Sequence, residues 1–117
     1  MTNFDASDVV EVPFPFIDRP VRKRRPALVL SIPAGERGAD LVVLAMITSA
    51  KRSAWPSDIP IAEPTAAGLN GPSVVRWKVF SIEPSHILSV RGRLSDVDFA
   101  SVTDRFRELF RTWVPER

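Results

Sequence analysis

The sequence contains no cysteine, one histidine and no long hydrophobic run. Without cysteine the chain cannot form the disulfide framework on which small secreted domains often depend. One histidine and no cysteine are too few for a zinc or similar site, so the sequence implies no metal and no cofactor. No segment approaches the roughly 20 apolar residues that cross a bilayer, and the polar start MTNFDASD is unlike a secretory signal. We therefore expect a cytoplasmic protein with no membrane segment.

Several catalytic motifs are missing as well. There is no GxxxxGK(S/T) phosphate loop, no GxSxG nucleophile elbow and no GxGxxG dinucleotide motif. The single histidine, His86, falls in the turn-like sequence EPSHIL, and we expect it at the surface. If His86 acted instead as the general base of a ribonuclease, it would lack an acid partner.

Length and charge constrain the number of domains and the kind of binding partner. The 117 residues fit a single domain spanning 1–117, because two hydrophobic cores would need a longer chain. Sixteen Lys and Arg against fourteen Asp and Glu leave a net charge of only +2, but five of the seven residues from Arg19 to Arg25 are basic. Charge alone favours a solvated loop there, and a cationic patch that binds a phosphate backbone is the functional alternative. Further cations stand at Lys51, Arg52, Arg76, Lys78, Arg91 and Arg93.

Hydrophobic periodicity predicts short strands followed by one helix. The proline-rich, basic segment from Pro13 to Pro26 is expected to be a long projecting loop. Ala27–Ile32 and Leu41–Thr48 are β-branched apolar runs around a Gly/Pro-rich turn, which predicts a central hairpin. The other expected strands are Asp8–Pro13, Asp58–Ile61 at an edge, Ser73–Phe80 and Ile87–Val90.

After the last strand the period changes to that of a helix. Ser95 can cap the helix, with Asp98 three residues on in capping-box position. An apolar face is expected to pack against the sheet; it comprises Phe99, Val102, Phe106, Leu109, Phe110 and Trp113. The predicted fold class is α+β, mainly antiparallel β, curled into a small barrel with a C-terminal helix.

Four short motifs, in order, resemble the MazF/PemK family of toxin–antitoxin ribonucleases. The first combines DVVEVPFPF, starting at Asp8, with KRRPALVL, starting at Lys23. MITS from Met46, AGL and SVVR from Ala67 and Ser73, and RGRLS from Arg91 follow, so the resemblance spans roughly residues 7–110. It implies a small SH3-like, plasmid-maintenance-toxin barrel that is usually a homodimer. It also implies a type II toxin that cleaves single-stranded RNA, chiefly mRNA, and is held inactive by a cognate antitoxin protein.

The resemblance assigns roles to individual residues. Arg25 matches the family's catalytic arginine and Thr48 its catalytic threonine, in a reaction where the ribose 2′-hydroxyl attacks the adjacent phosphate and leaves a 2′,3′-cyclic phosphate. A guanidinium offers paired donors to phosphoryl oxygens, without a metal or a histidine. Arginine, with a pKa above about 12, is a poor proton acceptor, so the general base stays open. Proposed contacts to RNA are Lys23, Arg24, Ser49, Lys51 and Arg76.

The sequence departs from the family pattern at two positions. Ser7 replaces a usual glycine, and Lys78 stands where some relatives carry an acidic residue to which a catalytic part is assigned. Trp77 is expected to pack in the core or an interface, whereas Phe14 and Phe16 can either pack or stack on bases. Two alternatives stay open: a non-catalytic toxin of this fold that poisons a protein such as DNA gyrase, and a plain RNA-binding barrel.

Overall fold

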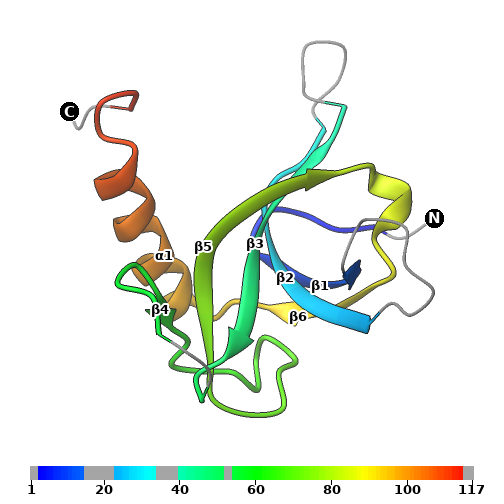
Figure 1. Cartoon of the computed structure of the whole chain (residues 1–117), viewed down its shortest axis with the longest axis horizontal. Helices are drawn as coiled ribbons and strands as arrows, with labels where there is room; N and C mark the ends of the chain where they lie inside the picture. The colour runs from blue at the N-terminus through cyan, green and yellow to red at the C-terminus, as the bar shows by residue number, and fades with distance from the viewer. Residues whose placement is uncertain (1–2, 15–22, 34–39, 52–53, 115–117) are drawn as a thin grey trace.

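The computed structural model describes residues 3–14, 23–33, 40–51 and 54–114. Its strands form one six-stranded antiparallel sheet in the order β4-β5-β3-β2-β1-β6. Figure 1 shows this sheet curling into a half-barrel with the helix α1 beside β5 and β4. The predicted fold class, mainly antiparallel β with one C-terminal helix, is confirmed. The elements are β1 (Asp8–Phe14), β2 (Lys23–Ser31), β3 (Val42–Ser49), β4 (Ile59–Pro60), β5 (Ser73–Ile82), the short 3-10 helix η2 (Pro84–His86), β6 (Ser89–Arg93) and α1 (Asp96–Leu109).

The curl follows from irregularities in the pairing of the strands. The pairing skips Arg91 of β6 opposite β1, Leu30 of β2 opposite β3, and Trp77 and Lys78 of β5 opposite β3. Each irregularity acts as a bulge, which bends the strand and increases its twist. The predicted central hairpin is present, because β2 and β3 pair antiparallel. The edge strand expected at 58–61 is the two-residue β4.

Alternation along the strands divides the buried side chains between the two faces of the sheet. On β1, for example, Val9 belongs to one hydrophobic cluster and Val10 to the other. The cluster that includes Val9 also contains Val102 of α1, so this face is the one covered by the helix. The other cluster fills the inside of the curl and extends to Ile87, just after η2. Trp77 packs against the first cluster, as predicted.

The segment expected to be a loop from Pro13 to Pro26 is strand at both ends, so that prediction is wrong there. Pro13 belongs to β1 and Pro26 to β2, and residues 15–22 between them lie outside the described residues. Each proline lies past the end of one neighbouring strand, because β6 pairs with β1 only as far as Glu11 and β3 pairs with β2 only from Ala27. Both prolines are thus edge positions on one side, where a missing N–H leaves no partner unsatisfied.

The last strand begins two residues later than predicted and ends three residues later. Ile87 follows η2 and β6 runs from Ser89 to Arg93, through Gly92, a poor strand former. Gly92 is required where it stands, because a Cβ there would lie 2.6 Å from the carbonyl oxygen of Ala66. His86 is exposed, as expected.

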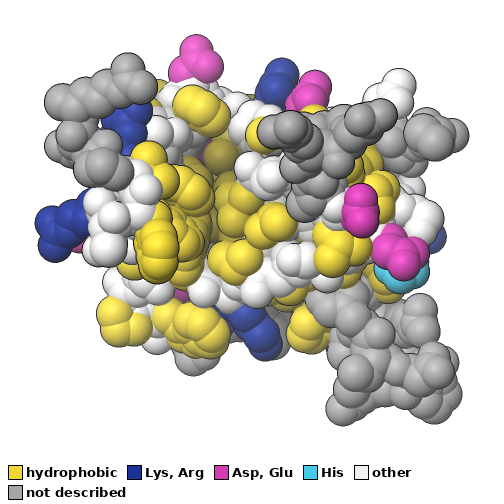
Figure 2. Space-filling view, turned by 90° about the horizontal axis from the view of Figure 1, so that it is seen from above, with side chains coloured by type: hydrophobic (Ala, Val, Ile, Leu, Met, Phe, Trp, Pro, Cys, Tyr) yellow, Lys and Arg dark blue, Asp and Glu magenta, His cyan; other side chains and the backbone are white. Residues whose placement is uncertain are grey.

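The apolar face of α1 is less buried than predicted. Val102 is buried, but Phe99, Phe106 and Leu109 are each more than a third exposed, and Trp113 lies beyond the helix with 82% of its surface exposed. Figure 1 gives the reason, since α1 begins beside β4 and runs outward from the sheet. Figure 2 shows hydrophobic side chains gathered in patches on the face seen from above. No helix among the described residues is long and apolar enough to span a membrane.

The start of α1 is anchored by a buried carboxylate. Ser95 is the N-cap and its hydroxyl accepts a hydrogen bond from the Asp98 backbone N–H, as the capping motif predicts. The Asp98 carboxylate, only 2% exposed, accepts hydrogen bonds from the backbone N–H groups of Ala62 and Glu63 at 2.7 and 2.9 Å. These bonds fix the helix to the segment that follows β4.

Candidate active site

Arg25 and Thr48 lie on neighbouring strands at the same end of the sheet. The β2–β3 pairing nearest to this end joins Ala27 to Met46. The same antiparallel register, extended by two residues, brings Arg25 opposite Thr48, and opposed side chains share a face. Both residues line the same two adjoining cavities, of about 490 and 370 Å³. The structure therefore brings the two predicted catalytic residues together.

The larger of these cavities, here called the aromatic cavity, combines cations with aromatic rings. Lys78 Nζ lies 5.6 Å from the centre of the Phe14 ring, and the Arg76 guanidinium carbon lies 4.7 Å from the centre of the Trp55 ring. Rings with a cation nearby are suited to stacking on nucleobases. The described residues that line it are Phe14, Arg25, Met46, Ile47, Thr48, Trp55, Arg76 and Lys78.

The smaller cavity, here called the polar cavity, is lined by loop backbone and small polar side chains. Lys51 and Arg91 supply its positive charge besides Arg25. The Ser49 hydroxyl accepts a hydrogen bond from the Lys51 backbone N–H at 3.2 Å, which fixes the turn after β3. Its described lining residues are Arg25, Pro26, Ile47, Thr48, Ser49, Lys51, Leu69, Asn70, Gly71, Pro72, Ser73 and Arg91.

A third, more voluminous cavity of about 1160 Å³ lies elsewhere and does not suit an anionic substrate. Asp40 and Glu83 are among its lining residues, together with apolar side chains such as Phe4 and Ile32. Two carboxylates would repel a phosphodiester. The two cationic cavities that share Arg25 and Thr48 are the better candidate site.

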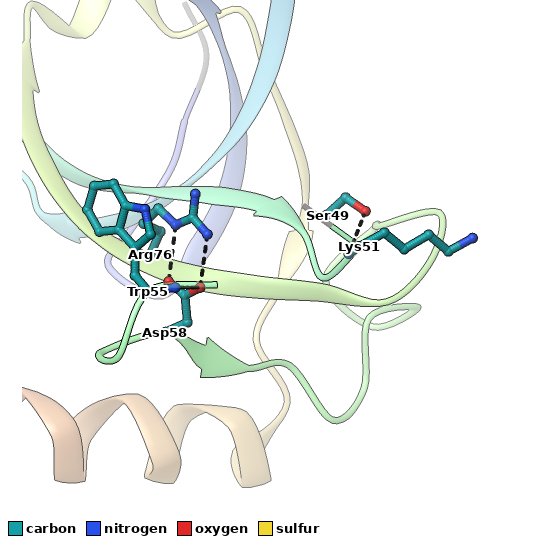
Figure 3. A network of polar contacts seen from close by, with 5 residues as sticks. All are labelled: Ser49, Lys51, Trp55, Asp58 and Arg76. Atoms are coloured by element: carbon teal, nitrogen blue, oxygen red, sulfur yellow. Dashed lines mark hydrogen bonds and ion pairs between the residues drawn. The ribbon is translucent and has the colours of Figure 1, made fainter. Parts of the chain in front are cut away.

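Arg76 of β5 is held by Asp58 in a two-pronged ion pair, shown in Figure 3. Its Nε and Nη2 donate to the two carboxylate oxygens at 3.1 and 2.9 Å. The hydrogen bonds from Arg76 hold the pKa of the Asp58 carboxyl below its ordinary value, although burial opposes the shift. The same contact raises the pKa of Arg76. Arg76 was predicted to hold RNA phosphate; the structure places it in the aromatic cavity with its charge already paired.

Asp58 also closes the turn that carries Trp55. The Trp55 backbone N–H donates to the Asp58 carboxylate at 2.9 Å, and the Asp58 N–H donates to the Trp55 carbonyl at 3.0 Å. Figure 3 shows the indole beside the Arg76 guanidinium, with Asp58 beneath both. One carboxylate thus positions the turn, the tryptophan and the arginine together.

Lys23 and Arg24 are not brought to the cavities with the other predicted site residues. Strand alternation directs Arg24 to the face opposite Arg25, and its Nη1 lies 3.6 Å from Glu11. Glu11 also lies 3.6 Å from Arg91, so it lowers the excess positive charge near the polar cavity. Lys23 is exposed at the start of β2, and neither residue is among the described side chains that line either cavity.

Sequence reasoning missed Trp55 and Asp58, which fell in the least regular stretch of the chain. One signal was present, because Trp55-Pro56-Ser57-Asp58 has the composition of a tight turn with proline at its second position. The partner of Asp58, however, is 18 residues away on β5. No spacing of residues in the sequence indicates that ion pair.

The arrangement suits phosphodiester chemistry that depends on electrostatics. Arg25 can donate two parallel hydrogen bonds to phosphoryl oxygens and Thr48 can donate one. Among the described residues that line the two cavities there is no Asp, Glu or His. The site can therefore stabilise negative charge, whereas the part of its lining that the structure describes offers no conventional proton acceptor.

The chain has recognisable relatives among solved structures. It resembles the Mycobacterium tuberculosis toxin MazF-mt6, with a TM-score of 0.65, 21% identity, and coverage of 88% of this chain and 95% of that one. It also resembles a mycobacterial endoribonuclease solved in complex with its cognate antitoxin, with a TM-score of 0.63, 13% identity, and coverage of 88% and 90%. These likenesses show the fold. No curated protein sequence matches the chain significantly.

A sequence model of one family matches nearly the whole chain. It is the family described as the PemK-like, MazF-like toxin of type II toxin–antitoxin systems, and the match covers residues 5–110. Every motif that carried the resemblance lies within that range. The protein therefore belongs to the PemK-like, MazF-like family of type II toxins, whose members are generally endoribonucleases.

Proposed function

We propose that this protein is a metal-independent endoribonuclease toxin that cleaves single-stranded RNA, chiefly mRNA, in the cytoplasm. The observation that carries the proposal is the shared position of Arg25 and Thr48 on the walls of the same two cavities. A phosphodiester at that junction would meet a guanidinium and a hydroxyl at once. Lys51 and Arg91 line the polar cavity, where the next phosphate of the chain could lie.

The proposed reaction is an internal transesterification. The 2′-oxygen of one ribose bonds to phosphorus, the bond from phosphorus to the 5′-oxygen breaks, and the products end in a 2′,3′-cyclic phosphate and a 5′-hydroxyl. Arg25 stabilises the charge that gathers on the phosphoryl oxygens, and Thr48 donates a hydrogen bond to one of them or to the attacking hydroxyl. The described lining offers no carboxylate or imidazole to accept the 2′-proton, so the proposal assigns roles to Arg25 and Thr48 and leaves the general base open.

Two partner proteins belong to the proposal. A structural relative was solved with its cognate antitoxin, and we propose that a small antitoxin likewise inhibits this protein. The exposed hydrophobic side chains of α1 supply apolar area that suits the proposed homodimer. Lys23, Arg24 and Ser49 remain proposed RNA contacts, the first two outside the cavities.

The test is cleavage of a mixed-sequence RNA by purified protein in EDTA. Wild type should cut it and leave cyclic phosphate ends, and Arg25→Ala should lower the rate by about 10²- to 10³-fold. Arg107→Ala is the control, because Arg107 is exposed on α1. Loss of activity in EDTA, or full activity of Arg25→Ala, would contradict the mechanism.

One observation favours a second candidate, a plain RNA-binding barrel. The cavities carry cations and aromatic rings, but the described residues that line them include no Asp, Glu or His. Such a module would bind the same RNA without product. Salt-sensitive RNA binding with no cleavage in the assay above would support the RNA-binding barrel. A gyrase supercoiling assay tests the third possibility, a toxin directed at a protein.

A further inference from the structure

We infer that Trp55 is a stacking platform for one nucleobase beside the scissile phosphate, with Asp58 and Arg76 as the residues that position it. The inference rests on the proposed function, because it assigns a base-binding subsite to the same site. Trp55 lines the aromatic cavity with Arg25 and Thr48. A base resting on the indole would therefore belong to a nucleotide that contacts the catalytic pair.

The three tryptophans of the chain have different surroundings. Trp77 packs against the rings of Phe106 and Phe110 at 6.2 and 6.1 Å between centroids, so its role is structural. Trp113 is 82% exposed, beyond the end of α1. Trp55 is 41% exposed and lines a cavity. An indole that is part open and part supported is what a stacking platform requires.

The support beneath Trp55 is rigid. The side chains of Asp58 and Arg76 are only 10% and 12% exposed, and two hydrogen bonds join them. Two further bonds join Asp58 to the backbone of Trp55. The guanidinium then lies 4.7 Å from the centre of the indole (Figure 3). The backbone bonds and the guanidinium contact restrain the indole before RNA binds, which reduces the conformational entropy lost on binding.

The arrangement also explains why an arginine in a cationic site is neutralised. A guanidinium meant for phosphate should present its donors to the cavity, but Nε and Nη2 of Arg76 face Asp58. Its guanidinium carbon lies over the Trp55 ring, 4.7 Å from the ring centroid. Arg76 therefore contributes to this subsite through the indole, and Arg25 provides the guanidinium for the phosphate.

The test is a thermodynamic cycle between protein and RNA. The probe is an oligonucleotide that the protein cuts, made entirely with 2′-O-methyl ribose so that attack is blocked, and a set of copies each with one abasic position. Dissociation constants are measured for wild type, Trp55→Leu, Trp55→Phe, Asp58→Asn and the control Trp113→Leu. Unfolding midpoints of all variants are compared first.

One abasic position next to the cleavage site should weaken binding to wild type by about 5- to 100-fold, the range for loss of one stacked base. Trp55→Leu should bind the intact probe as weakly as wild type binds that abasic probe. Removing the base at that position should not weaken the binding of Trp55→Leu any further. Trp55→Phe should restore most of the affinity, and Trp113→Leu should match wild type. Asp58→Asn should reduce the fold-change in dissociation constant that the missing base causes at that position, and at no other position. A general structural defect would weaken binding to all probes alike.

The inference and the proposed function can fail separately. Suppose that wild type cuts RNA but Trp55→Leu binds the probe as tightly as Trp113→Leu does. The inference is then wrong and the nuclease proposal stands. The same holds if every abasic position weakens binding to Trp55→Leu by the same factor as it weakens binding to wild type. If Trp55→Leu does not fold, the abasic scan on wild type decides, and absence of any position with a 5-fold effect overturns the inference. If wild type neither binds nor cuts RNA, both are wrong.

Discussion

The hydroxyl of Thr48 can be separated from the rest of its side chain by substitution. Thr48→Val keeps the shape of this residue near the end of β3 and removes the donor. Loss of one donor aimed at developing phosphoryl charge should lower kcat by about 10²-fold, whereas Thr48→Ser should keep most of the activity. The measurement is steady-state cleavage of a defined RNA over a range of substrate concentrations, which gives kcat and KM separately.

The matched control for Thr48→Val is Thr65→Val, because Thr65 is exposed and is not among the residues lining either cavity. Equal rates for Thr48→Val and Thr65→Val would remove Thr48 from the mechanism. A rise in KM with kcat unchanged would assign it to binding alone.

Asp58 makes stability depend on pH in a predictable direction. Its pKa in the folded protein lies below the ordinary 3.8, chiefly because of the hydrogen bonds from Arg76. A depressed pKa means that the carboxylate form stabilises the fold above the unfolded pKa, and that this contribution is lost as pH falls through the folded pKa. Asp58→Asn should therefore lower the unfolding temperature at pH 7, and the gap to wild type should narrow below about pH 4.

The measurement is thermal unfolding of both proteins at pH 7, 5, 4 and 3. Other carboxylates titrate in both proteins, so the difference between them isolates Asp58. A gap that stays constant down to pH 3 would mean that the Asp58–Arg76 pair does not depend on the charge of the carboxylate.

At the scale of single residues, sequence motifs indicated the proposed catalytic pair but not its surroundings. Arg25 and Thr48 were identified because they stand in motifs that resemble those of the family, and the structure places them on the neighbouring strands β2 and β3. Trp55 and Asp58 were not, because their roles arise from contact with Arg76, a partner fixed only when the irregular segment folds back against β5. Contacts between segments that are far apart in the chain produce no periodic pattern in the sequence.

Two glycines allow the loop after β4 to pack directly against β6. A Cβ on Gly92 would lie 2.6 Å from the carbonyl oxygen of Ala66, and a Cβ on Gly68, at φ +71°, would lie 2.2 Å from the carbonyl oxygen of Arg91. Gly92→Ala should therefore reduce the free energy of unfolding by about 1–3 kcal/mol, the usual cost of overpacking. Gly71→Ala is the matched control, since nothing lies within 4 Å of the Cβ it would add.

The measurement is urea unfolding of Gly92→Ala, Gly71→Ala and wild type. Gly71→Ala should lie within about 0.5 kcal/mol of wild type, as expected for a substitution away from packed contacts. Equal midpoints for the two variants would show that the loop can move away from β6 without penalty.

At the scale of elements, periodicity located the strands and the helix but not how they pack. The hairpin of β2 and β3 was predictable because its apolar runs are β-branched and continuous. The exposure of the α1 face was not, because helical spacing records which residues share a face and not what covers it. The strand character of Lys23–Pro26 was hidden by a proline that is tolerated only where the neighbouring strand has ended.

For the whole molecule, the placement of charge matters more than its sum. A net charge of +2 would bind RNA weakly, yet Arg25, Lys51, Lys78 and Arg91 line the two adjoining cavities. The fold gathers these cations from strands and loops far apart in the chain. The basic cluster visible in the sequence contributes only Arg25 to the described lining.

This gathering of charge predicts how RNA binding responds to salt. Each phosphate contact to single-stranded nucleic acid contributes about −0.7 to the slope of log K against log salt concentration. Lys51→Gln should make the slope less negative by about 0.7 if Lys51 contacts one phosphate from the polar cavity. Arg107→Gln removes the same charge from an exposed site on α1 and should leave the slope unchanged. The experiment titrates the uncleavable 2′-O-methyl probe at several salt concentrations. Equal slopes for the two variants would mean that net charge, rather than the cavity, attracts the RNA.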